Sequence, residues 1–220
     1  MSEQVELIPV KTRILTHKDD IVDVIQKYTK GNLGPDDVVS VAESVVAITQ
    51  GRAVRPEDLK PGFWARLLSR LFPSEGSIAS WHGMQALINE EGTMRVLIAV
   101  VCGSIGKIFG QNGVFYRMAG EQARLIDDVT GTMPPYDKYI VYGPHDPNGV
   151  AEAIRQATGC FGAAVADVND LKRAAVLGVS KGLDPKVLEK MLLDNPFGNA
   201  SQKTSIVIIR NYAKTVNSKA

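Results

Sequence analysis

The chain has 220 residues, of which 45% are hydrophobic and 22% are charged, with 25 Lys plus Arg against 24 Asp plus Glu. This balance excludes disordered, collagen-like and coiled-coil proteins. A net charge of +1 gives no preference for nucleic acid or for an anionic membrane surface. The length allows one large domain or two small ones.

The two cysteines, Cys102 and Cys160, lie far apart in apolar stretches and form no CxxC motif. We expect both to be buried thiols of a reducing compartment. The N-terminal residues lack the basic and apolar regions of a signal peptide, and the longest apolar run, residues 96–101, is too short to span a bilayer. We therefore predict a cytoplasmic protein with no membrane and no nucleic-acid partner.

The first half of the chain predicts two strands and two helices. A β-branched segment at residues 5–15 predicts a strand interrupted at Pro9, and apolar spacing from Ile21 predicts a short amphipathic helix. Residues 38–48 are apolar enough to predict a single buried strand. Residues 63–71 predict a helix whose apolar face holds Trp64, Leu67, Leu68 and Leu71.

A helix is then expected from Ser77 to Gly92, and residues 93–113 fit either a helix with a glycine face or a strand with a glycine-rich loop. Asp146-Pro147 and Asp184-Pro185 each open a capped helix. Strands are predicted at 123–128, 139–142, 162–168, 176–179 and 204–210, before a frayed tail. Because strands and helices do not alternate regularly, the predicted fold class is α+β with mixed sheets.

A phosphate-binding loop is the first chemistry that the glycines suggest. Gly103-Ser-Ile-Gly106-Lys107 resembles half of such a loop, but position 101 is Val and Ile108 follows the lysine, so the pattern fails at both ends. Tight packing or turns explain these glycines better. The chain has no GxSxG motif for serine hydrolysis, and His145 lies in a predicted loop.

Acidic side chains follow two predicted strands. Asp127 and Asp128 end one strand, and Asp167, Asn169 and Asp170 end another. Carboxylate clusters of this kind can converge on Mg²⁺ or Mn²⁺, which would bind nucleotide phosphates. The alternative, that these acids cap turns after apolar strands, also remains open and is the more common case.

The order of the segments resembles the coenzyme F420-0:L-glutamate ligase family. The likeness is carried by VELIPVKTRILTHKDDIVDVI, DDVVSVAESVVAITQGRAV, ARLIDD and GPHDPNGVAEAIRQATGCFGAAVADVND. The last of these, which contains His145 and Arg155, is the most specific because it matches a DP…A..IR…D pattern. These segments cover most of the chain, which therefore resembles a divergent member of the family.

The resemblance implies a GTP-dependent ligase that activates a carboxylate as an acyl phosphate and joins it to the amine of glutamate. It also implies an α+β fold with mixed sheets, an intertwined homodimer and one family domain over residues 1–220, with a subdivision allowed near 55–92. The implied metal is Mn²⁺ or Mg²⁺, held by Asp127 and Asp167 with Asn169 and Asp170 in support. The implied nucleotide, GTP with ATP as an alternative, lies near Ile8, Pro9, Val10 and Lys11.

Several positions depart from the family pattern. A lysine and an SK pair of the family become Ser44, Ala47 and Ile48, the glutamate before the glycine becomes Gln50, and the threonine after the aspartate becomes Val168. Ser or Ile cannot replace the point charge of a phosphate-binding lysine. Three hypotheses therefore follow: an amino-acid ligase with altered substrates, a catalytically diverged binding protein of the same fold, or a different metal-assisted phosphate reaction.

Overall fold

The computed structural model describes residues 5–74, 76–127, 134–169, 171–198 and 202–217. The chain forms two compact units. We call Met1–Gly51 with Pro144–Ala220 the sheet unit, and Arg52–Gly143 the helical unit. The predicted α+β class with a mixed sheet is confirmed.

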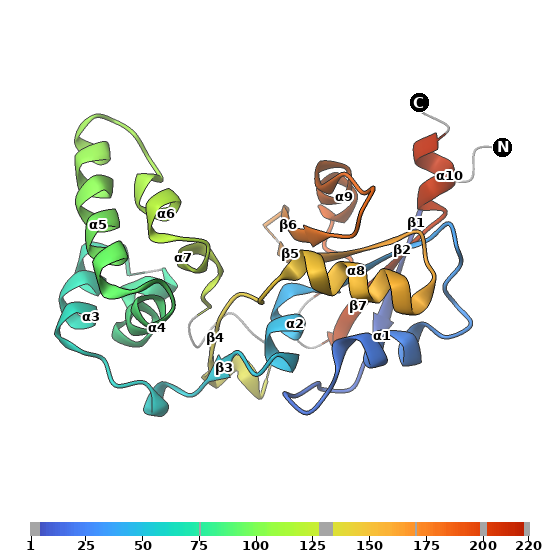
Figure 1. The fold of residues 1–220 in the computed structure, drawn as a ribbon, viewed down its shortest axis with the longest axis horizontal. Helices are drawn as coiled ribbons and strands as arrows, with labels where there is room; N and C mark the ends of the chain where they lie inside the picture. The colour runs from blue at the N-terminus through green and yellow to red at the C-terminus, as the bar shows by residue number, and fades with distance from the viewer. Residues whose placement is uncertain (1–4, 75, 128–133, 170, 199–201, 218–220) are drawn as a thin grey trace. The chain divides into compact units, whose positions relative to one another are not determined.

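The sheet unit is built on five strands in the order β1-β7-β2-β5-β6 (Figure 1). Its β2 and β5 pair in parallel, and every other neighbouring pair is antiparallel. The bounds are β1 Glu6–Lys11, β2 Val38–Ala42, β5 Gly162–Asn169, β6 Arg173–Val179 and β7 Thr204–Arg210.

Helices cover both faces of this sheet. Val39 and Val165 point to the face covered by α1 and α8, and Val38 and Ala164 point to the opposite core with α9, as the period of two in a strand requires. The helices are α1 Ile21–Thr29, α2 Glu43–Thr49, α8 Pro147–Thr158, α9 Pro185–Leu192 and α10 Tyr212–Asn217.

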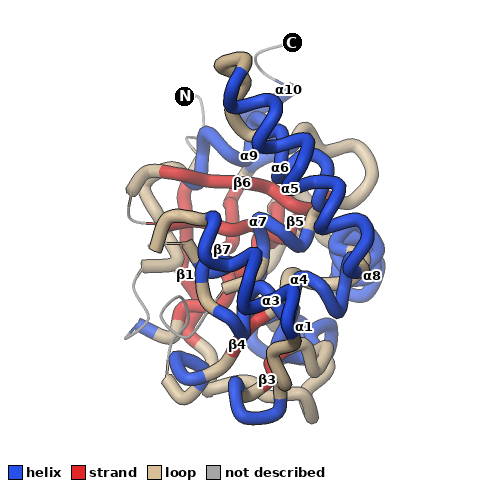
Figure 2. Tube along the Cα trace, turned by 90° about the vertical axis from the view of Figure 1, so that its left-hand side faces the viewer, coloured by secondary structure: helices blue, strands red, loops and turns tan. Residues whose placement is uncertain are grey.

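The helical unit has a core of its own, to which its helices, drawn in blue in Figure 2, contribute most of the buried residues. Two short strands, β3 Ala53–Val54 and β4 Ile140–Val141, pair with each other near the first and last residues of this unit. Its helices are α3 Phe63–Leu68, α4 Trp81–Glu91, α5 Thr93–Ile108, α6 Val114–Ala119 and α7 Gln122–Leu125. Short 3₁₀ turns occupy Pro56–Asp58, Ser69–Leu71, Ser77–Ala79 and Tyr136–Lys138.

Several predicted elements are confirmed. Asp146 caps α8 through its side chain, Gly159 ends that helix with a left-handed conformation, and Asp184 caps α9. Of the two alternatives for residues 93–113, the helix is correct as α5, while Gly110 and Gly113 form turns with positive φ.

Other predictions were wrong. Residues 38–48 form strand β2 followed by helix α2, and Gln122–Leu125 is helical although a strand was expected there. The helix predicted from Ser77 begins only at Trp81, because Ser80 provides its cap, and the tail expected to fray contains α10. Cys160 is buried as expected, but Cys102 is only half-buried.

The face of α3 was also predicted wrongly. Ala65 and Leu68 are its buried residues, while Trp64 and Leu67 are exposed. Within the described residues, no helix combines the length and the apolar composition that crossing a membrane requires.

Candidate functional site

One edge of the sheet brings together the ends of three strands. The pairings make β1, β2 and β5 run in the same direction, so that Lys11, Ala42 and Asp167 lie toward the same end of the sheet. Since neighbouring strands are spaced by about 4.8 Å, β1 and β5, three steps apart in the sheet, are separated by roughly 14 Å. In open α/β sheets, ligands bind beyond the carboxyl ends of the strands.

Asp167 extends from β5 at this edge. Its backbone is paired with Ala175 of β6, and its side chain is exposed. Neighbouring protein atoms still remove enough water from its carboxyl group to raise the pKa above the ordinary value for aspartate. Among the described residues no Lys or Arg forms an ion pair with Asp167, so nothing offsets this cost.

Asn169 forms side-chain hydrogen bonds within the turn that follows β5. Its side-chain oxygen accepts hydrogen bonds from the backbone N–H groups of Leu171, at 3.1 Å, and Arg173, at 3.3 Å. The amide thus caps the turn between β5 and β6, as the alternative to metal binding requires for this residue. Asp170, the fourth predicted metal ligand, lies outside the described residues.

The four residues predicted to lie near the nucleotide belong to β1, an edge strand of the sheet. Ile8 and Val10 are half-buried, and Pro9 and Lys11 are exposed. An edge strand accommodates Pro9 because proline has no N–H to donate to a further strand. The register shifts between Val10 and Lys11, so the lysine stands at an irregular strand end.

The positions aligned with the lysine and the SK pair of the family pattern are helical here. Ser44, Ala47 and Ile48 all belong to α2, where Ala47 and Ile48 are buried and Ser44 is half-buried. A lysine at the buried position of Ile48 would place its charge away from water, at a large desolvation cost. A buried apolar side chain therefore occupies one of the two positions at which the family pattern has lysine.

Gln50 follows α2 and forms a double hydrogen bond with the backbone of His145. Its Nε2 donates to the His145 carbonyl at 2.9 Å, and its Oε1 accepts from the His145 N–H at 2.7 Å. A glutamate at this position would accept the second bond but could not donate the first. The departure from the family pattern at Gln50 therefore has a structural explanation.

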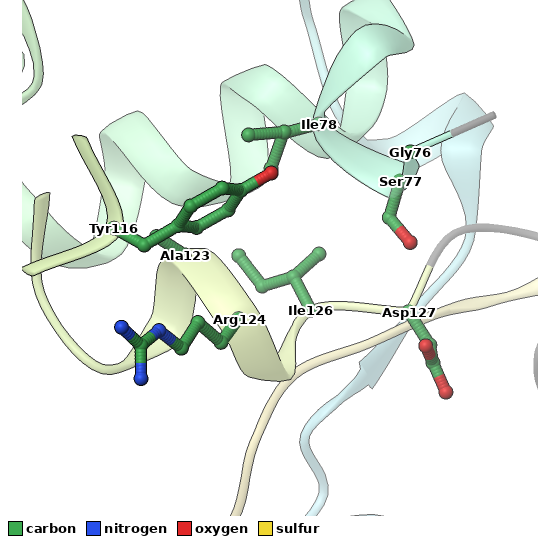
Figure 3. Close-up of a pocket in the computed structure, with 8 residues that line it drawn as sticks. All are labelled: Gly76, Ser77, Ile78, Tyr116, Ala123, Arg124, Ile126 and Asp127. Atoms are coloured by element: carbon green, nitrogen blue, oxygen red, sulfur yellow. The ribbon is translucent and has the colours of Figure 1, made fainter. Parts of the chain in front are cut away.

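Asp127 belongs to the helical unit. Its backbone forms an isolated bridge with Val141, with N–O distances of 2.8 and 2.9 Å, and its side chain is half-buried. It lines a pocket of about 300 Å³ whose wall also includes Ser77, Tyr116 and Arg124 (Figure 3).

Polar and apolar residues both line the pocket, and the side-chain ends of Arg124 and Asp127 extend away from Ile126 (Figure 3). Arg124 and Asp127 lie on opposite sides of Ile126, and the Ser77 hydroxyl lies on the side of Asp127 (Figure 3). A cation and a carboxylate separated by an apolar side chain suit a small ligand that carries charge of both signs.

Arg52 is a residue whose role the sequence did not predict. Its side chain is buried, its Nε donates to the Gly143 carbonyl at 2.6 Å, and its Nη2 forms an ion pair with Glu90 at 2.7 Å. Its guanidinium carbon lies 5.2 Å from the centre of the Tyr142 ring. In the sequence, Gly51-Arg52 indicates only a turn. In the structure, Arg52 at the start of the helical unit contacts Tyr142 and Gly143 at its end.

The predicted site residues are thus divided between the units. Asp167, Asn169 and the β1 residues belong to the sheet unit, and Asp127 belongs to the helical unit. Within the described parts of the chain, no three His, Cys, Asp or Glu side chains gather closely enough to form a metal site by themselves. Arg155, from the most specific segment of the resemblance, pairs with Glu152 at 2.6 Å on α8.

No curated protein sequence matches the chain. The family model for F420-0:gamma-glutamyl ligase matches residues 9–166, which include the second half of β1, the whole helical unit and most of β5, and the match ends one residue before Asp167. Because this match covers most of the chain, the protein belongs to the F420-0:gamma-glutamyl ligase family.

Proposed function

We propose that this protein is a metal- and nucleotide-dependent amide (γ-glutamyl) ligase that acts through an acyl phosphate. Family membership indicates F420-0:gamma-glutamyl ligase-like function and small-molecule substrates. The finer assignment is supported by the sheet edge, where Lys11 and the unneutralised carboxyl group of Asp167 lie at the same end of parallel-running strands. This coincidence is the observation that carries the proposal.

In the proposed reaction, a carboxylate oxygen of the acceptor attacks the γ-phosphorus of GTP, and GDP leaves. The amine of glutamate then attacks the acyl carbon, loses a proton and expels inorganic phosphate, which leaves an amide. Lys11 would hold a phosphate by its charge, with the backbone of Ile8, Pro9 and Val10 beside the nucleotide. ATP is the alternative phosphate donor.

The residues present fit a divalent metal in a limited way. Mg²⁺ and Mn²⁺ are commonly held by one or two carboxylates, with substrate phosphates and water completing the coordination. Asp167 is such a carboxylate, because it lies at the sheet edge and forms no ion pair with a Lys or Arg among the described residues. We propose Asp127, Asn169 and Asp170 as further ligands of the metal. The metal would neutralise the phosphate charge during transfer.

We assign the pocket of the helical unit to a substrate that bears a carboxylate. Arg124 offers a guanidinium to that carboxylate, and Asp127 and Ser77 offer acceptors to an amine. This arrangement fits an amino acid such as glutamate. We also propose that the ligase is a homodimer and acts in the cytoplasm, as the family resemblance and the cysteine usage predict.

Calorimetry tests the nucleotide and metal part of the proposal. GTP and ATP should bind only in the presence of Mn²⁺ or Mg²⁺, and Asp167→Asn should weaken binding at least tenfold. Asp194→Asn is the matched control, because Asp194 is an exposed carboxylate of the same unit with only a long contact, 3.8 Å, to Lys172. Absence of nucleotide binding with either metal would contradict the proposal.

Phosphate release tests the reaction itself. Release from GTP should require both F420-0 and glutamate, and Arg124→Gln should raise the KM for glutamate more than it lowers kcat. Arg70→Gln, a change of the same type elsewhere in the helical unit, should leave both constants unchanged.

A catalytically diverged binding protein is the second candidate function. The observation in its favour is the burial of Ile48, at a position where the family pattern has a lysine. It predicts that nucleotide or F420-0 binds with no phosphate release under any combination of substrates. Glutamate-dependent release of phosphate would exclude it.

A further inference from the structure

The longest helix of the helical unit, α5, exposes an uninterrupted apolar stripe. The exposed fractions in this stripe run from 49% at Ile105 to 81% at Ile108. The stripe consists of Met94, Ile98, Val101, Ile105 and Ile108, which follow one another at spacings of four, three, four and three residues. A helix of 16 residues is about 24 Å long, so the stripe extends along nearly all of it.

The opposite face of α5 is already covered. Val96 and Ala99 are fully buried, and α6 packs against the glycines of the second half of the helix (Figure 1). A Cβ at Gly106 would lie 2.6 Å from a methyl group of Val114, which shows how close the approach is. Most residues of the helix are therefore apolar, as in helices that are buried on every side, while one face remains exposed.

The spacing indicates what covers this face. Alternating steps of four and three residues place the stripe at the two core positions of a heptad repeat, with isoleucine at one and methionine, valine and isoleucine at the other. We propose that α5 packs along this stripe against α5 of a second copy of the chain. This inference rests on the homodimer of the proposed function and names its interface.

The exposed area is adequate for such an interface. With Phe109, which is 77% exposed at the end of the helix, the stripe presents on the order of 600–700 Å² of apolar surface. A standard interface takes about 800 Å² from each partner. An apolar face also complements itself, so one copy can meet another about a two-fold axis.

The charges around the stripe favour a second copy over a lipid surface. The helix carries only two basic residues, Arg95 and Lys107. Arg95 is engaged by Glu91 at 2.5 Å, and its Nε donates to the Met118 carbonyl. A helix that lies on an anionic membrane usually carries many more basic side chains beside its apolar face.

Mass measurement tests the interface. Light scattering after size exclusion should give a dimer for the wild type and a monomer for the double variant Ile98→Glu, Ile105→Glu. Leu171→Glu is the matched control, because Leu171 is 76% exposed in the sheet unit and its substitution should leave the dimer intact. A dimer that survives the double variant overturns the interface and leaves the homodimer standing, whereas a monomeric wild type overturns both.

Cross-linking gives a second measurement that does not depend on folding of the glutamate variants. Val101 is the centre of the stripe, so it meets its own copy whether the two helices pack parallel or antiparallel. Val101→Cys in a Cys102→Ser background should form a covalent dimer under mild oxidation, and Leu171→Cys in the same background should not. Absence of the covalent dimer overturns the inference. Binding of the wild type to phosphatidylcholine–phosphatidylglycerol vesicles that the double variant abolishes also overturns it.

Discussion

At the scale of single residues, Asp167 combines exposure with a raised pKa. A carboxyl group whose pKa is higher in the folded chain than in the unfolded chain destabilises the fold when it is ionised. The penalty is complete above the folded pKa and disappears below the unfolded value, so the fold gains stability as the pH falls between the two. Such a cost is typical of a residue kept for function rather than for stability.

Asp167→Asn should therefore raise the thermal midpoint at pH 7. The difference from wild type should shrink as the pH falls into the ordinary range of aspartate, because both chains then carry a neutral side chain. Thermal unfolding monitored by circular dichroism at a series of pH values measures this. A midpoint that falls at pH 7, or a difference that does not depend on pH, would contradict the assignment.

The acidic pattern at strand ends and the family resemblance both indicated the candidate site residues, but the hydrogen bonds around them had no signal in the sequence. Asn169 follows a buried strand, as metal ligands often do, and its position did not predict that its oxygen accepts two backbone hydrogen bonds from the next turn. The side-chain contacts of Gln50 and Arg52 reach residues more than ninety positions away in the chain, His145 and Gly143. Contacts over such separations leave no local pattern.

At the scale of elements, Glu152 of α8 forms hydrogen bonds within its helix and with Lys181, which lies outside it. This carboxylate accepts hydrogen bonds from Arg155 and Gln156 on the same helix and from the backbone N–H of Lys181 at 3.2 Å. These donors, with the Arg155 side chain first, lower the pKa of Glu152 to about 2.

A glutamate with a lowered pKa stabilises the fold above its unfolded pKa, and this stabilisation is lost as the pH falls from about 4.5 to about 2. Glu152→Gln should thus lower the thermal midpoint at pH 7 and have no effect near pH 2. Glu6→Gln, an exposed carboxylate on β1, should leave the midpoint unchanged at both pH values. If Glu152→Gln lowered the thermal midpoint equally at pH 7 and pH 2, the charge of Glu152 would not be the source of the stabilisation.

The close contact between α5 and α6 requires a glycine at position 103, because there is no room for a side chain there. A Cβ at Gly103 would lie 2.9 Å from the Phe115 Cβ and 3.2 Å from its Cα, so backbone would have to move. We expect Gly103→Ala to destabilise the protein by about 1–2 kcal/mol, although alanine favours a helix by about 1 kcal/mol. Ser104→Ala, next to it on the exposed side, should stabilise slightly in chemical denaturation.

Elements with a clear cap were predictable, and elements distinguished only by their apolar content were not. Asp146 and Asp184 mark the starts of α8 and α9 in the sequence, because aspartate before proline suits a helix N-terminus. Residues 38–48 show no such signal, since β2 and α2 are both buried, and a short fully apolar run fits a strand or a helix equally well.

At the scale of the whole molecule, the chain forms two compact units. The composition allowed either one or two domains, and the structure divides the chain after Gly51 and before Pro144. Side chains next to these points form hydrogen bonds within their own units, Gln50 with His145 in the sheet unit and Arg52 with Gly143 in the helical unit. Because these partners are distant in the sequence, no local pattern predicted the contacts.

Arg52→Met should therefore destabilise the helical unit selectively. Loss of the bonds to Glu90 and Gly143 leaves a partly buried carboxylate and a carbonyl without their donor, at a cost of about 2–3 kcal/mol. Hydrogen exchange should show faster exchange across Arg52–Gly143 than in the wild type, with little change in β2 and β5. Arg95→Met, which removes the exposed pair with Glu91, should cost less than about 1 kcal/mol.

The pairing of β3 with β4 has a consequence for how this chain can change over evolution. Ala53 faces Val141 across that ladder, and the Tyr142 N–H donates to the Arg52 carbonyl at 2.9 Å, so the segment of 92 residues begins and ends at adjacent points. A segment with adjoining ends can be lengthened, shortened or exchanged while its host closes only a short loop. The helical unit is thus a module that can acquire new surfaces, such as the α5 stripe, while the register of the five-stranded sheet is preserved.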